Sequence, residues 1–388
     1  MSVFFKALKF FECFIIDQKP FDFNMVHQYN LPPLLAEEIF VLSLYHHYNI
    51  NKRRLKYERE KIGCFPLYQT VHYPIKRKGV VNMKIGIVGG GSVGLLIGSY
   101  LSEKYDVTIY VRRLQQKKQL EQHGLQLANT SSTSFVKSKL LEDMVEMDVL
   151  FICVKQYHLT DVIPIVNQTN EQTPLFFLQN GMGHIDTVKT LGQPIFIGVV
   201  EHGALRQNDY TVSHTGRGII KLASLRETDQ VQRFVQAFHQ TEFPFQVAAD
   251  WEALLLEKLV INAVINPLTA LFNVPNGDLL KNEYLRFLAK QLCHETAKTF
   301  HLDDVQEWKR IKEVAINTKE NISSMLKDVR ERRPTEIEAI LGYIRKQHSS
   351  PEHIPFISFA YNGIKALEVK NTSNDVQSIE LHDTNMYD

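Results

Sequence analysis

One polar stripe interrupts an otherwise apolar part of the sequence. In the segment DWEALLLEKLVINAVINPLTALF, residues 250–272, Lys258, Asn262 and Asn266 follow one another at a spacing of four. This spacing places three side chains on one face of a helix. A buried ammonium or amide group is costly unless it is hydrogen-bonded. The polar side chains therefore need hydrogen-bond partners. If the partners belong to the protein itself, the stripe has a purely structural role; otherwise the partner is a bound molecule.

A glycine-rich turn supplies the second chemical signal. Residues 84–88 are expected to form a strand, and Gly89, Gly91 and Gly94 follow it in the pattern G-x-G-x-x-G before an apolar helix. The first glycine permits the turn, the second lets a pyrophosphate approach the backbone, and the third lets helix pack on strand. With Ser92 and Val93 at the helix start, the free N–H groups of the helix would face phosphate. This context favours a dinucleotide-binding Rossmann-type fold over a merely tight turn.

Two arginines mark the end of the second expected strand, DVTIYVRR. An acidic residue at this place binds the ribose 2′-hydroxyl of NAD, whereas arginine suits the 2′-phosphate of NADP. Arg112 therefore favours NADPH as the cofactor. For Arg113, a solvated side chain at a strand end is the better interpretation.

Polar residues also end two later strands. The segments MDVLFICVK and TPLFFLQNGMG are nearly continuous apolar runs, typical of buried parallel strands, and they lead to Lys155 and Asn180. Because ligands of doubly wound sheets bind beyond the carboxyl ends of strands, both residues are candidates for the site. Asn180 could instead be a simple turn former before glycine.

The sequence changes to helical patterns from Asp250 onward. Helices are expected over residues 250–272, 283–301, 305–330 and 334–347, with Pro334 in the first turn of the last. The polar residues of interest there are Asn321, Ser323, Ser324 and Glu336. Taken alone, Glu336 would be a solvated first-turn acid and Ser324 a helix-surface serine.

Composition excludes several classes of protein. The net charge of +1 gives the chain no strong preference for nucleic acid or an anionic membrane. No stretch reaches the ~18 consecutive apolar residues of a transmembrane helix. The fifteen histidines form no metal-binding pattern, so we expect no metal. The four cysteines, Cys13, Cys64, Cys153 and Cys293, have no disulfide or metal spacing, which fits a reducing, cytoplasmic location.

The first 82 residues differ from the rest. They contain 15 of the 40 aromatic residues and 12 Lys or Arg against 7 Asp or Glu, without helical or strand periodicity. The segment KGVVNM before and including Met83 can be encoded with a purine-rich GGAG shortly ahead of ATG, as in a bacterial ribosome-binding site. We expect that residues 1–82 are not a functional domain and that Met83 is the natural start. The rival interpretation is an accessory segment, helical around PPLLAEEIFVLSLYHHY, that packs on the enzyme or on a partner.

From Met83 to about residue 368 the chain resembles the ketopantoate reductase (2-dehydropantoate 2-reductase) family. The matching segments are GGGSVG, VKQYH, QNGMG, EKLVINAVINPLTALFNVPNG and ENISSMLKDVRERRPTEIEAI, in the order of the family. The resemblance implies an α/β fold: a Rossmann-type dinucleotide-binding domain (83–249), an all-helical C-terminal domain (250–368) and the active site between them. Residues 369–388 would be a polar tail. The resemblance also implies reduction of 2-dehydropantoate to (R)-pantoate by NADPH, in pantothenate biosynthesis.

The resemblance also implies roles for individual residues. Lys258 matches the catalytic lysine of the family and Glu336 its partner acid. The positions that match substrate-binding residues are Asn262, Asn266, Ser324 and Asn180. The positions that match cofactor contacts are Gly89, Gly91, Ser92, Val93, Gly94, Arg112, Lys155, Asn180 and Glu336. The partner would be a small-molecule substrate, with no nucleic acid or membrane, and a homodimer is the candidate assembly.

The implied reaction gives the polar stripe a physical role. As hydride reaches the C2 carbonyl carbon, negative charge grows on oxygen, and an ammonium beside that oxygen stabilises it and can supply the proton. Two rivals remain open. A related 3-hydroxyacid dehydrogenase would differ in its substrate, and an NADP-binding sensor without chemistry would be expected to lack Lys258 or Glu336, which are both present.

Overall fold

The computed structural model describes residues 83–128, 130, 133–226 and 230–372. The expectation that residues 1–82 are not a functional domain, with its alternative of an accessory segment, therefore lies outside the described residues. The same holds for residues 373–388 of the expected tail.

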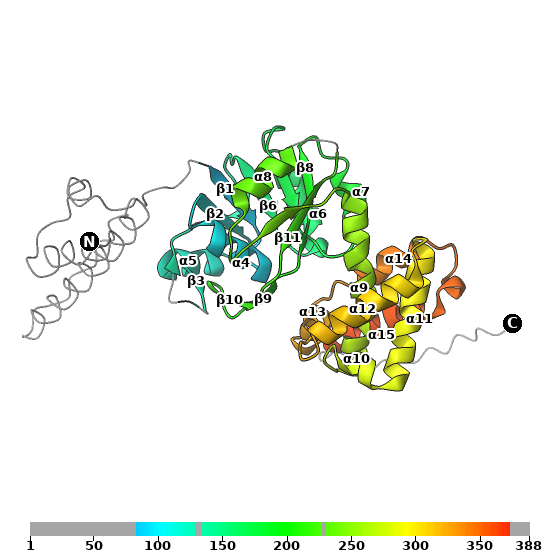
Figure 1. The fold of residues 1–388 in the computed structure, drawn as a ribbon. Coiled ribbons are helices and arrows are strands. Elements are labelled where there is room, and N and C mark those ends of the chain that lie inside the picture. Colours follow the sequence, from blue (N-terminus) through cyan, green and yellow to red (C-terminus); the bar gives the residue numbers. More distant parts are fainter. Residues whose placement is uncertain (1–82, 129, 131–132, 227–229, 373–388) are drawn as a thin grey trace, which may run out of the picture. The chain divides into compact units, whose positions relative to one another are not determined.

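An eight-stranded sheet forms the first half of the described chain (Figure 1). Its order is β12 (Phe245–Val247), β11 (Ile220–Ser224), β8 (Ile195–Val200), β7 (Leu175–Phe177), β6 (Val149–Ile152), β1 (Lys84–Val88), β2 (Asp106–Val111) and β5 (Lys137–Leu140). The six strands from β8 to β5 are parallel, and β11 runs antiparallel to β8. A smaller sheet has the order β4 (Thr133–Ser134), β3 (Leu125–Leu127), β10 (Thr211–Gly216) and β9 (Gly203–Arg206).

Two apolar cores cover the two faces of the large sheet, because successive side chains of a strand point to opposite faces. In β6, Leu150 and Ile152 belong to one core and Phe151 to the other. Helices α4 (Ser92–Leu101) and α8 (Gln230–Phe238) contribute to the core around Phe151. Helices α6 (Leu159–Val166) and α7 (Ile185–Val188) contribute to the other core. Both faces of the strands are therefore buried, as the apolar runs predicted.

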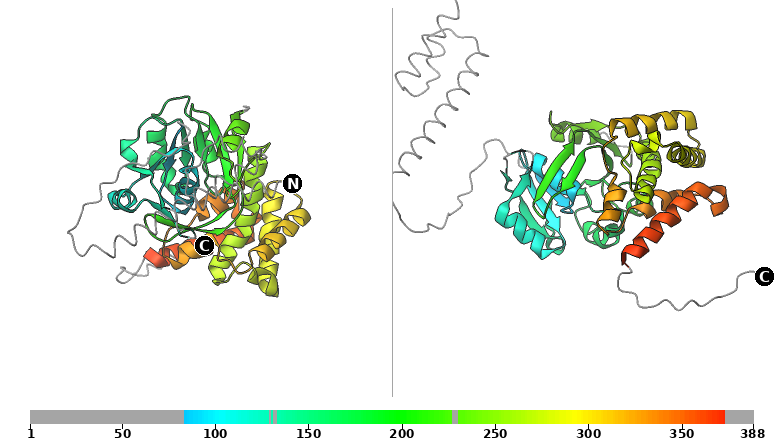
Figure 2. Two further views of the ribbon diagram at one scale, coloured as in Figure 1. Left: turned by 60° about the vertical axis from the view of Figure 1, so that its left-hand side comes forward. Right: turned by 90° about the horizontal axis from the view of Figure 1, so that it is seen from below.

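Helix α9 (Trp251–Phe272) organises the second half. It begins where the Asp250 side chain accepts a hydrogen bond from the Glu252 N–H at 2.8 Å, and it ends at Asn273, which is left-handed with φ 54°. The helices around it are α10 (Asp278–Lys281), α11 (Glu283–Thr299), α12 (Asp304–Asn317), α13 (Ser324–Arg330) and α15 (Pro355–Thr372) (Figure 2). Their buried residues join the same core as α6 and α7, so one apolar core connects sheet and helices.

The length and composition of α9 would allow it to cross a membrane. Most of its residues are buried inside the protein. Leu259, Val260, Ala263 and Val264, for example, are fully buried. A core helix passes the same test of length and composition, and α9 is such a helix.

The fold class predicted from sequence is confirmed, and the element boundaries need three corrections. The helix expected over residues 305–330 is two helices, α12 and α13, because backbone hydrogen bonds from Asn276 and Gly277 to Asn321 and Lys319 hold the intervening turn. Pro334 precedes its helix rather than starting it. A π-helical turn, Glu338–Gly342, leads into α14 (Tyr343–Arg345), and the Thr335 hydroxyl accepts from the Ile337 N–H instead. Finally, α15 was not predicted, and it extends to Thr372, into the expected tail.

Candidate active site

The glycine turn after β1 has the geometry of a phosphate cradle. Gly89 has φ +114°, a conformation that side chains rarely adopt. A Cβ atom on Gly94 would lie 2.0 Å from the carbonyl oxygen of Gly89, so only glycine allows helix α4 to pack this close to the turn. In contrast, a Cβ atom on Gly91 would meet nothing within 4 Å. The space beside Gly91 is open for a ligand to approach the backbone.

The start of α4 is also suited to an anion. Gly91 is the N-cap, no side chain caps the helix, and no acidic residue lies in its first turn, which contains Ser92 and Val93. The first N–H groups of the helix therefore face the turn without a side-chain acceptor. The Gln116 amide, from α5 (Leu114–His123), donates to the Gly90 carbonyl oxygen at 2.7 Å and supports the turn from behind.

The two arginines after β2 lie in different surroundings. The Arg112 guanidinium lies 3.1 and 2.8 Å from the two ring nitrogens of His158 and 3.7 Å from Asp161, and its side chain is about half exposed. Arg113 forms an ion pair with Asp209 instead. Arg112, whose ion pair with Asp161 is the longer of the two at 3.7 Å, is therefore the better placed arginine to bind a further anion.

Four of the residues predicted for the site, Lys155, Asn180, Lys258 and Glu336, lie close together. The Asn180 amide donates to the Glu336 carboxylate at 3.0 Å, and the Glu336 side chain is 8% exposed. The ammonium of Lys258 donates to the carbonyl oxygen of Val200, at the end of β8. The Glu336 carboxylate acts electrostatically on both Lys155 and Lys258, so the cluster joins three strand ends of the sheet to α9 and to the segment before the π-helical turn.

The two lysines of this cluster are shifted in opposite directions. Burial lowers the pKa of Lys258, and the nearby carboxylates of Glu201 and Glu336 offset this only in part. For Lys155, burial also lowers the pKa, but the carboxylates of Glu336 and Asp328 outweigh it and the net pKa is raised. Lys258 is thus the better proton donor, while Lys155 is a fixed positive charge.

Asp328 is a site residue that the sequence analysis missed. It is 3% exposed and lies in α13, where it forms an ion pair with Lys155 and accepts from the Arg333 guanidinium at 3.1 and 2.8 Å. One available signal was its spacing, because Asp328 follows Ser324 by four residues and so shares a helix face with it. Asp328 connects a residue of the sheet half to the helical half.

The remaining predicted residues lie on α9 and at the start of α13. Asn262 is partly buried and Asn266 is 8% exposed, and neither amide has a hydrogen-bond partner in the described part of the chain. Ser324 is the first residue of α13 and is exposed. Its neighbour Ser323 is buried, caps α13 through the Leu326 N–H at 3.1 Å, and accepts from Thr269 of α9 at 2.7 Å. Ser323 thus has a structural role that leaves Ser324 free.

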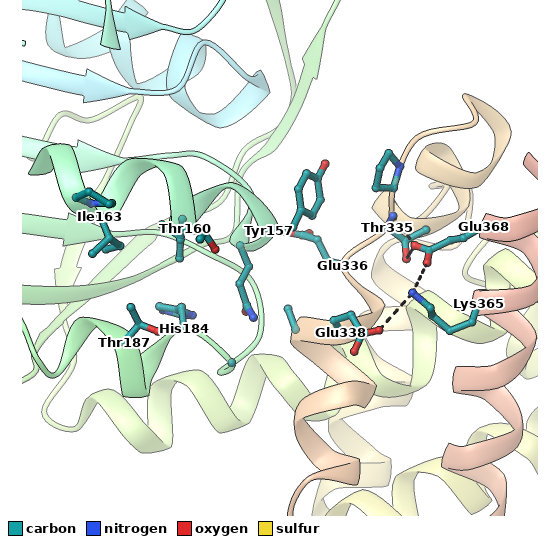
Figure 3. Close-up of a pocket in the computed structure, with 16 residues that line it drawn as sticks. Tyr157, Thr160, Ile163, His184, Thr187, Thr335, Glu336, Glu338, Lys365 and Glu368 are labelled. Atoms are coloured by element: carbon teal, nitrogen blue, oxygen red, sulfur yellow. Dashed lines mark hydrogen bonds and ion pairs between the residues drawn. The ribbon is translucent and has the colours of Figure 1, made fainter. Parts of the chain in front are cut away.

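Glu336 also lines a cavity of about 630 Å³ (Figure 3). One wall carries Tyr157, Thr160 and His184, and the other carries Glu338 and Lys365. Among the predicted site residues only Glu336 lines it. The cavity therefore adjoins the lysine cluster without containing Lys258.

The fold and these clusters define a class: a dinucleotide-dependent oxidoreductase with a Rossmann-type half and a helical half. Comparisons with known families show which family of this class the chain belongs to. The family model described as ketopantoate reductase PanE/ApbA matches residues 85–227, and the family model for its C-terminal part matches residues 250–368. The chain belongs to the ketopantoate reductase family.

Individual relatives agree with this assignment. The 2-dehydropantoate 2-reductase of Bacillus subtilis (strain 168) is 41% identical over 309 residues, which cover 75% of this chain and 99% of the relative. The enzyme of the same name from Listeria monocytogenes is 33% identical, over 74% of this chain and 97% of the relative.

Solved structures show the same fold. The crystal structure described as probable 2-dehydropantoate 2-reductase from Bacillus subtilis has a TM-score of 0.67 and 39% identity, and the match covers 74% of this chain and all of that one. D-mandelate dehydrogenase with NADH has a TM-score of 0.69, with 75% of this chain and 100% of that chain covered. At 20% identity this second match shows the fold alone.

Proposed function

We propose that this chain catalyses the NADPH-dependent reduction of 2-dehydropantoate to (R)-pantoate, a step of pantothenate (vitamin B5) biosynthesis. Family membership and the names of the relatives support the reaction. The observation that carries it is the arrangement of Lys258, partly buried with a lowered pKa, near the Glu336 carboxylate, which accepts from Asn180. An acidic ammonium in this place can stabilise charge on a carbonyl oxygen and then protonate it.

The proposed roles follow from the positions of the side chains. Lys258 stabilises the developing oxyanion and supplies the proton. The Glu336 carboxylate offsets the positive charges of Lys155 and Lys258, and it orients Asn180. Asn262 and Asn266 offer amides that lack partners in the described residues, so they can hydrogen-bond the polar groups of the substrate. Ser324 adds an exposed hydroxyl at the start of α13.

The residues present fit a nicotinamide dinucleotide. We propose that Gly89, Gly91 and Gly94, with the N–H groups of Ser92 and Val93, hold its pyrophosphate in the open space beside Gly91. When bound, NADPH supplies the hydride. Lys155 and Asn180 lie beyond the ends of β6 and β7, where they can position the nicotinamide end.

Arg112→Ala is expected to weaken NADPH binding by about tenfold or more and to leave NADH binding nearly unchanged. The reason is that only NADPH has the 2′-phosphate to which the guanidinium would donate. Fluorescence titration with both cofactors measures the two dissociation constants. Arg113→Ala is the matched control, since Arg113 is occupied by Asp209. Equal losses for NADPH and NADH would contradict the assignment.

The pH dependence of turnover should report Lys258. The ammonium form is required, and its pKa is lowered, so kcat should fall as pH rises through a pKa below that of a free lysine. Glu201 raises this pKa and Lys221 lowers it. Glu201→Gln should therefore move the alkaline limb to lower pH, and Lys221→Met to higher pH. If the fall of kcat at high pH occurs at the same pH in both variants and in the wild type, Lys258 is not the titrating group.

The domain boundaries are also a proposal: a cofactor domain over 83–249, a substrate domain over 250–368, and no function for residues 1–82. A protein that starts at Met83 should be soluble, with kcat and KM equal to those of the full chain, because every proposed site residue lies after Met83. Steady-state assays of both proteins test this, and N-terminal sequencing from the native host tests the start. Loss of activity on truncation would show that the extension contributes to function.

We propose a cytoplasmic homodimer as the working assembly. Tyr284 and Phe287 of α11 are 74% and 54% exposed, Phe359 of α15 is 58% exposed, and the Phe287 ring lies 6.1 Å from the ring of Phe356 in α15. Exposed aromatic patches of this kind favour association. A structural relative from Staphylococcus aureus is described as dimeric, although at 21% identity it shows the fold alone. Light scattering at several concentrations measures the oligomeric state.

A spectrophotometric assay tests the function directly. Oxidation of NADPH should be fast with ketopantoate and slow with ketoisovalerate and oxaloacetate. Faster turnover of either alternative substrate would place the chain with a related 2-oxo acid reductase. An absence of oxidation with every substrate would leave it as a cofactor-binding protein.

A further inference from the structure

Glu336 lies in a short stretch without helical or strand structure, residues 333–336, between α13 and the π-helical turn. After it, the chain is fixed by the Ile340 N–H, which donates to the Glu336 carbonyl oxygen at 3.2 Å. Before it, Thr335 belongs to no helix, so its place depends on contacts with other elements. The orientation of the Glu336 carboxylate follows from the backbone on both sides.

Glu368, near the end of α15, is the hydrogen-bond partner of Thr335. One of its carboxylate oxygens, Oε1, accepts from the Thr335 N–H at 2.8 Å and from the Thr335 hydroxyl at 2.7 Å. Thr335 is 5% exposed, so the loss of this acceptor would leave two buried donors unpaired, which is costly. Glu368 therefore fixes both the backbone and the side chain of the residue directly before Glu336.

The second carboxylate oxygen of Glu368 has a different partner. Oε2 lies 3.0 Å from the Lys365 ammonium, which also lies 3.3 Å from the Glu338 carboxylate (Figure 3). Burial raises the pKa of Glu368, but the hydrogen bonds from Thr335 and the charge of Lys365 outweigh it, and the net pKa is lowered. Glu368 is therefore ionised at neutral pH, and hydrogen bonds to a charged acceptor are the stronger kind.

The stretch that Glu368 fixes carries the carboxylate at the centre of the lysine cluster. Glu336 accepts from the Asn180 amide at 3.0 Å, and its charge offsets the effect of burial, which lowers the pKa of Lys155 and of Lys258. Electrostatic effects depend on distance, so a displaced Glu336 would change the acidity of Lys258.

We propose that Glu368 is a positioning residue: by holding Thr335, it places the Glu336 carboxylate at the distance from Lys258 that the reaction requires. This inference rests on the roles of Lys258 and Glu336 in the proposed function, and it gives α15 a part in the reaction. The alternative is that the two hydrogen bonds only stabilise the fold. In that case their loss would leave the pH dependence of turnover unchanged.

The pH dependence of kcat is a specific measurement because few charges act on Lys258. Within the described chain, the charged groups that act on its ammonium are Glu201 after β8, Lys221 of β11 and Glu336. Glu368 is not one of them, so the removal of its charge alone should leave the pKa of Lys258 unchanged. A shift of the pH profile on substitution of Glu368 would therefore arise from a displaced Glu336.

Glu368→Leu and Glu368→Gln separate the two possibilities. Leucine removes the acceptor for Thr335, so kcat should fall about tenfold or more, the scale expected when a group at the reacting centre is displaced. The Glu336 carboxylate would then offset less of the effect of burial on Lys258, so the fall of kcat at high pH should move to lower pH. Glutamine keeps an amide oxygen as the acceptor, and it should retain the wild-type pH profile and most of the turnover.

Two neighbours of Glu368 provide matched controls. Lys365→Met removes its ion-pair partner, and Glu338→Gln removes a nearby carboxylate, but both leave the acceptor for Thr335 in place. Both variants should keep the wild-type pH profile. A profile shifted as far in either control as in Glu368→Leu would attribute the effect to charge and overturn the proposal.

Thr335→Val serves if Glu368→Leu does not fold, which urea unfolding of each variant determines. It removes only the hydroxyl and leaves the bond from the Thr335 N–H to Glu368. The fall of kcat at high pH should move in the same direction by a smaller amount. A folded Thr335→Val enzyme with the wild-type profile, beside an unfolded Glu368→Leu, would count as failure of the proposal.

Glu336→Gln distinguishes this inference from the proposed function. Alone it should move the fall of kcat to lower pH, and the addition of Glu368→Leu should move it no further, because no charge remains to be displaced. If Glu336→Gln leaves the profile unchanged, the role of Glu336 in the proposed function is wrong. If it shifts the profile while folded Glu368→Leu does not, the positioning role is overturned and the proposed function stands. Equal losses of turnover in Glu368→Gln and Glu368→Leu would also overturn the positioning role.

Discussion

Replacing Lys258 with alanine is expected to lower kcat by ~10²-fold or more, the usual effect of removing a positioned acid and charge-stabilising group. NADPH affinity should remain, because the glycine turn and Arg112 lie on other elements. The expected loss is large because Lys258 is the ammonium of the polar stripe on α9 and its pKa is lowered toward the range of an effective acid. Stopped-flow single turnovers with NADPH and ketopantoate measure the chemical step directly.

The matched control for Lys258 is Lys298, an exposed lysine of α11. Lys298→Ala should leave both kcat and the NADPH dissociation constant unchanged. A Lys258→Ala enzyme with near-normal single-turnover rates would remove this residue from the mechanism. A variant that also fails to bind NADPH would indicate a disturbed fold rather than lost chemistry.

The second large effect is expected from the glycine turn, where two similar substitutions should fail in different ways. Gly94→Ala should lower the free energy of unfolding by ~1–3 kcal/mol, as overpacking does, because its Cβ would lie 2.0 Å from the Gly89 carbonyl oxygen. Gly91→Ala should fold with normal stability, since its Cβ meets nothing within 4 Å. The added methyl group would instead occupy the space proposed for the pyrophosphate and weaken NADPH binding about tenfold or more.

Urea unfolding and NADPH titration of the two variants distinguish these outcomes. The expected pattern is lost stability for Gly94→Ala and lost affinity at full stability for Gly91→Ala. If Gly91→Ala binds NADPH as the wild type does, the open space beside Gly91 does not hold the cofactor. If Gly94→Ala is as stable as the wild type, the close packing of α4 on the turn is not rigid.

Much of the fold was predictable because its signals are local. The strand Lys84–Val88, the glycine turn and the apolar helix follow one another within 18 residues, and each has a characteristic pattern. The helix that carries Lys258, Asn262 and Asn266 was predicted from its periodicity, and α9 contains all three. Where local propensity and tertiary packing agree, a sequence pattern suffices.

The errors occur where tertiary contacts decide. The break between α12 and α13 depends on backbone hydrogen bonds to Asn276 and Gly277, more than 40 residues earlier in the chain. The late start of the helix after Pro334 depends on Thr335, whose N–H and hydroxyl both donate to Glu368 of α15. Asp328 escaped notice because its partner, Lys155, lies 173 residues away. No periodicity in a single sequence contains such pairings.

The pairing of Lys155 with Asp328 has a consequence for protein engineering. A chimaera that joins the cofactor half of this enzyme to the helical half of a relative places Lys155 opposite a foreign α13. If that relative lacks an acid at the position of Asp328, Lys155 loses its ion pair in a partly buried setting, where an unpaired charge is costly. Active recombinants should therefore be those in which both partners come from one parent or are chemically equivalent. A crossover at residue 250 would separate Lys155 from Asp328, so the two halves cannot be exchanged independently of this ion pair.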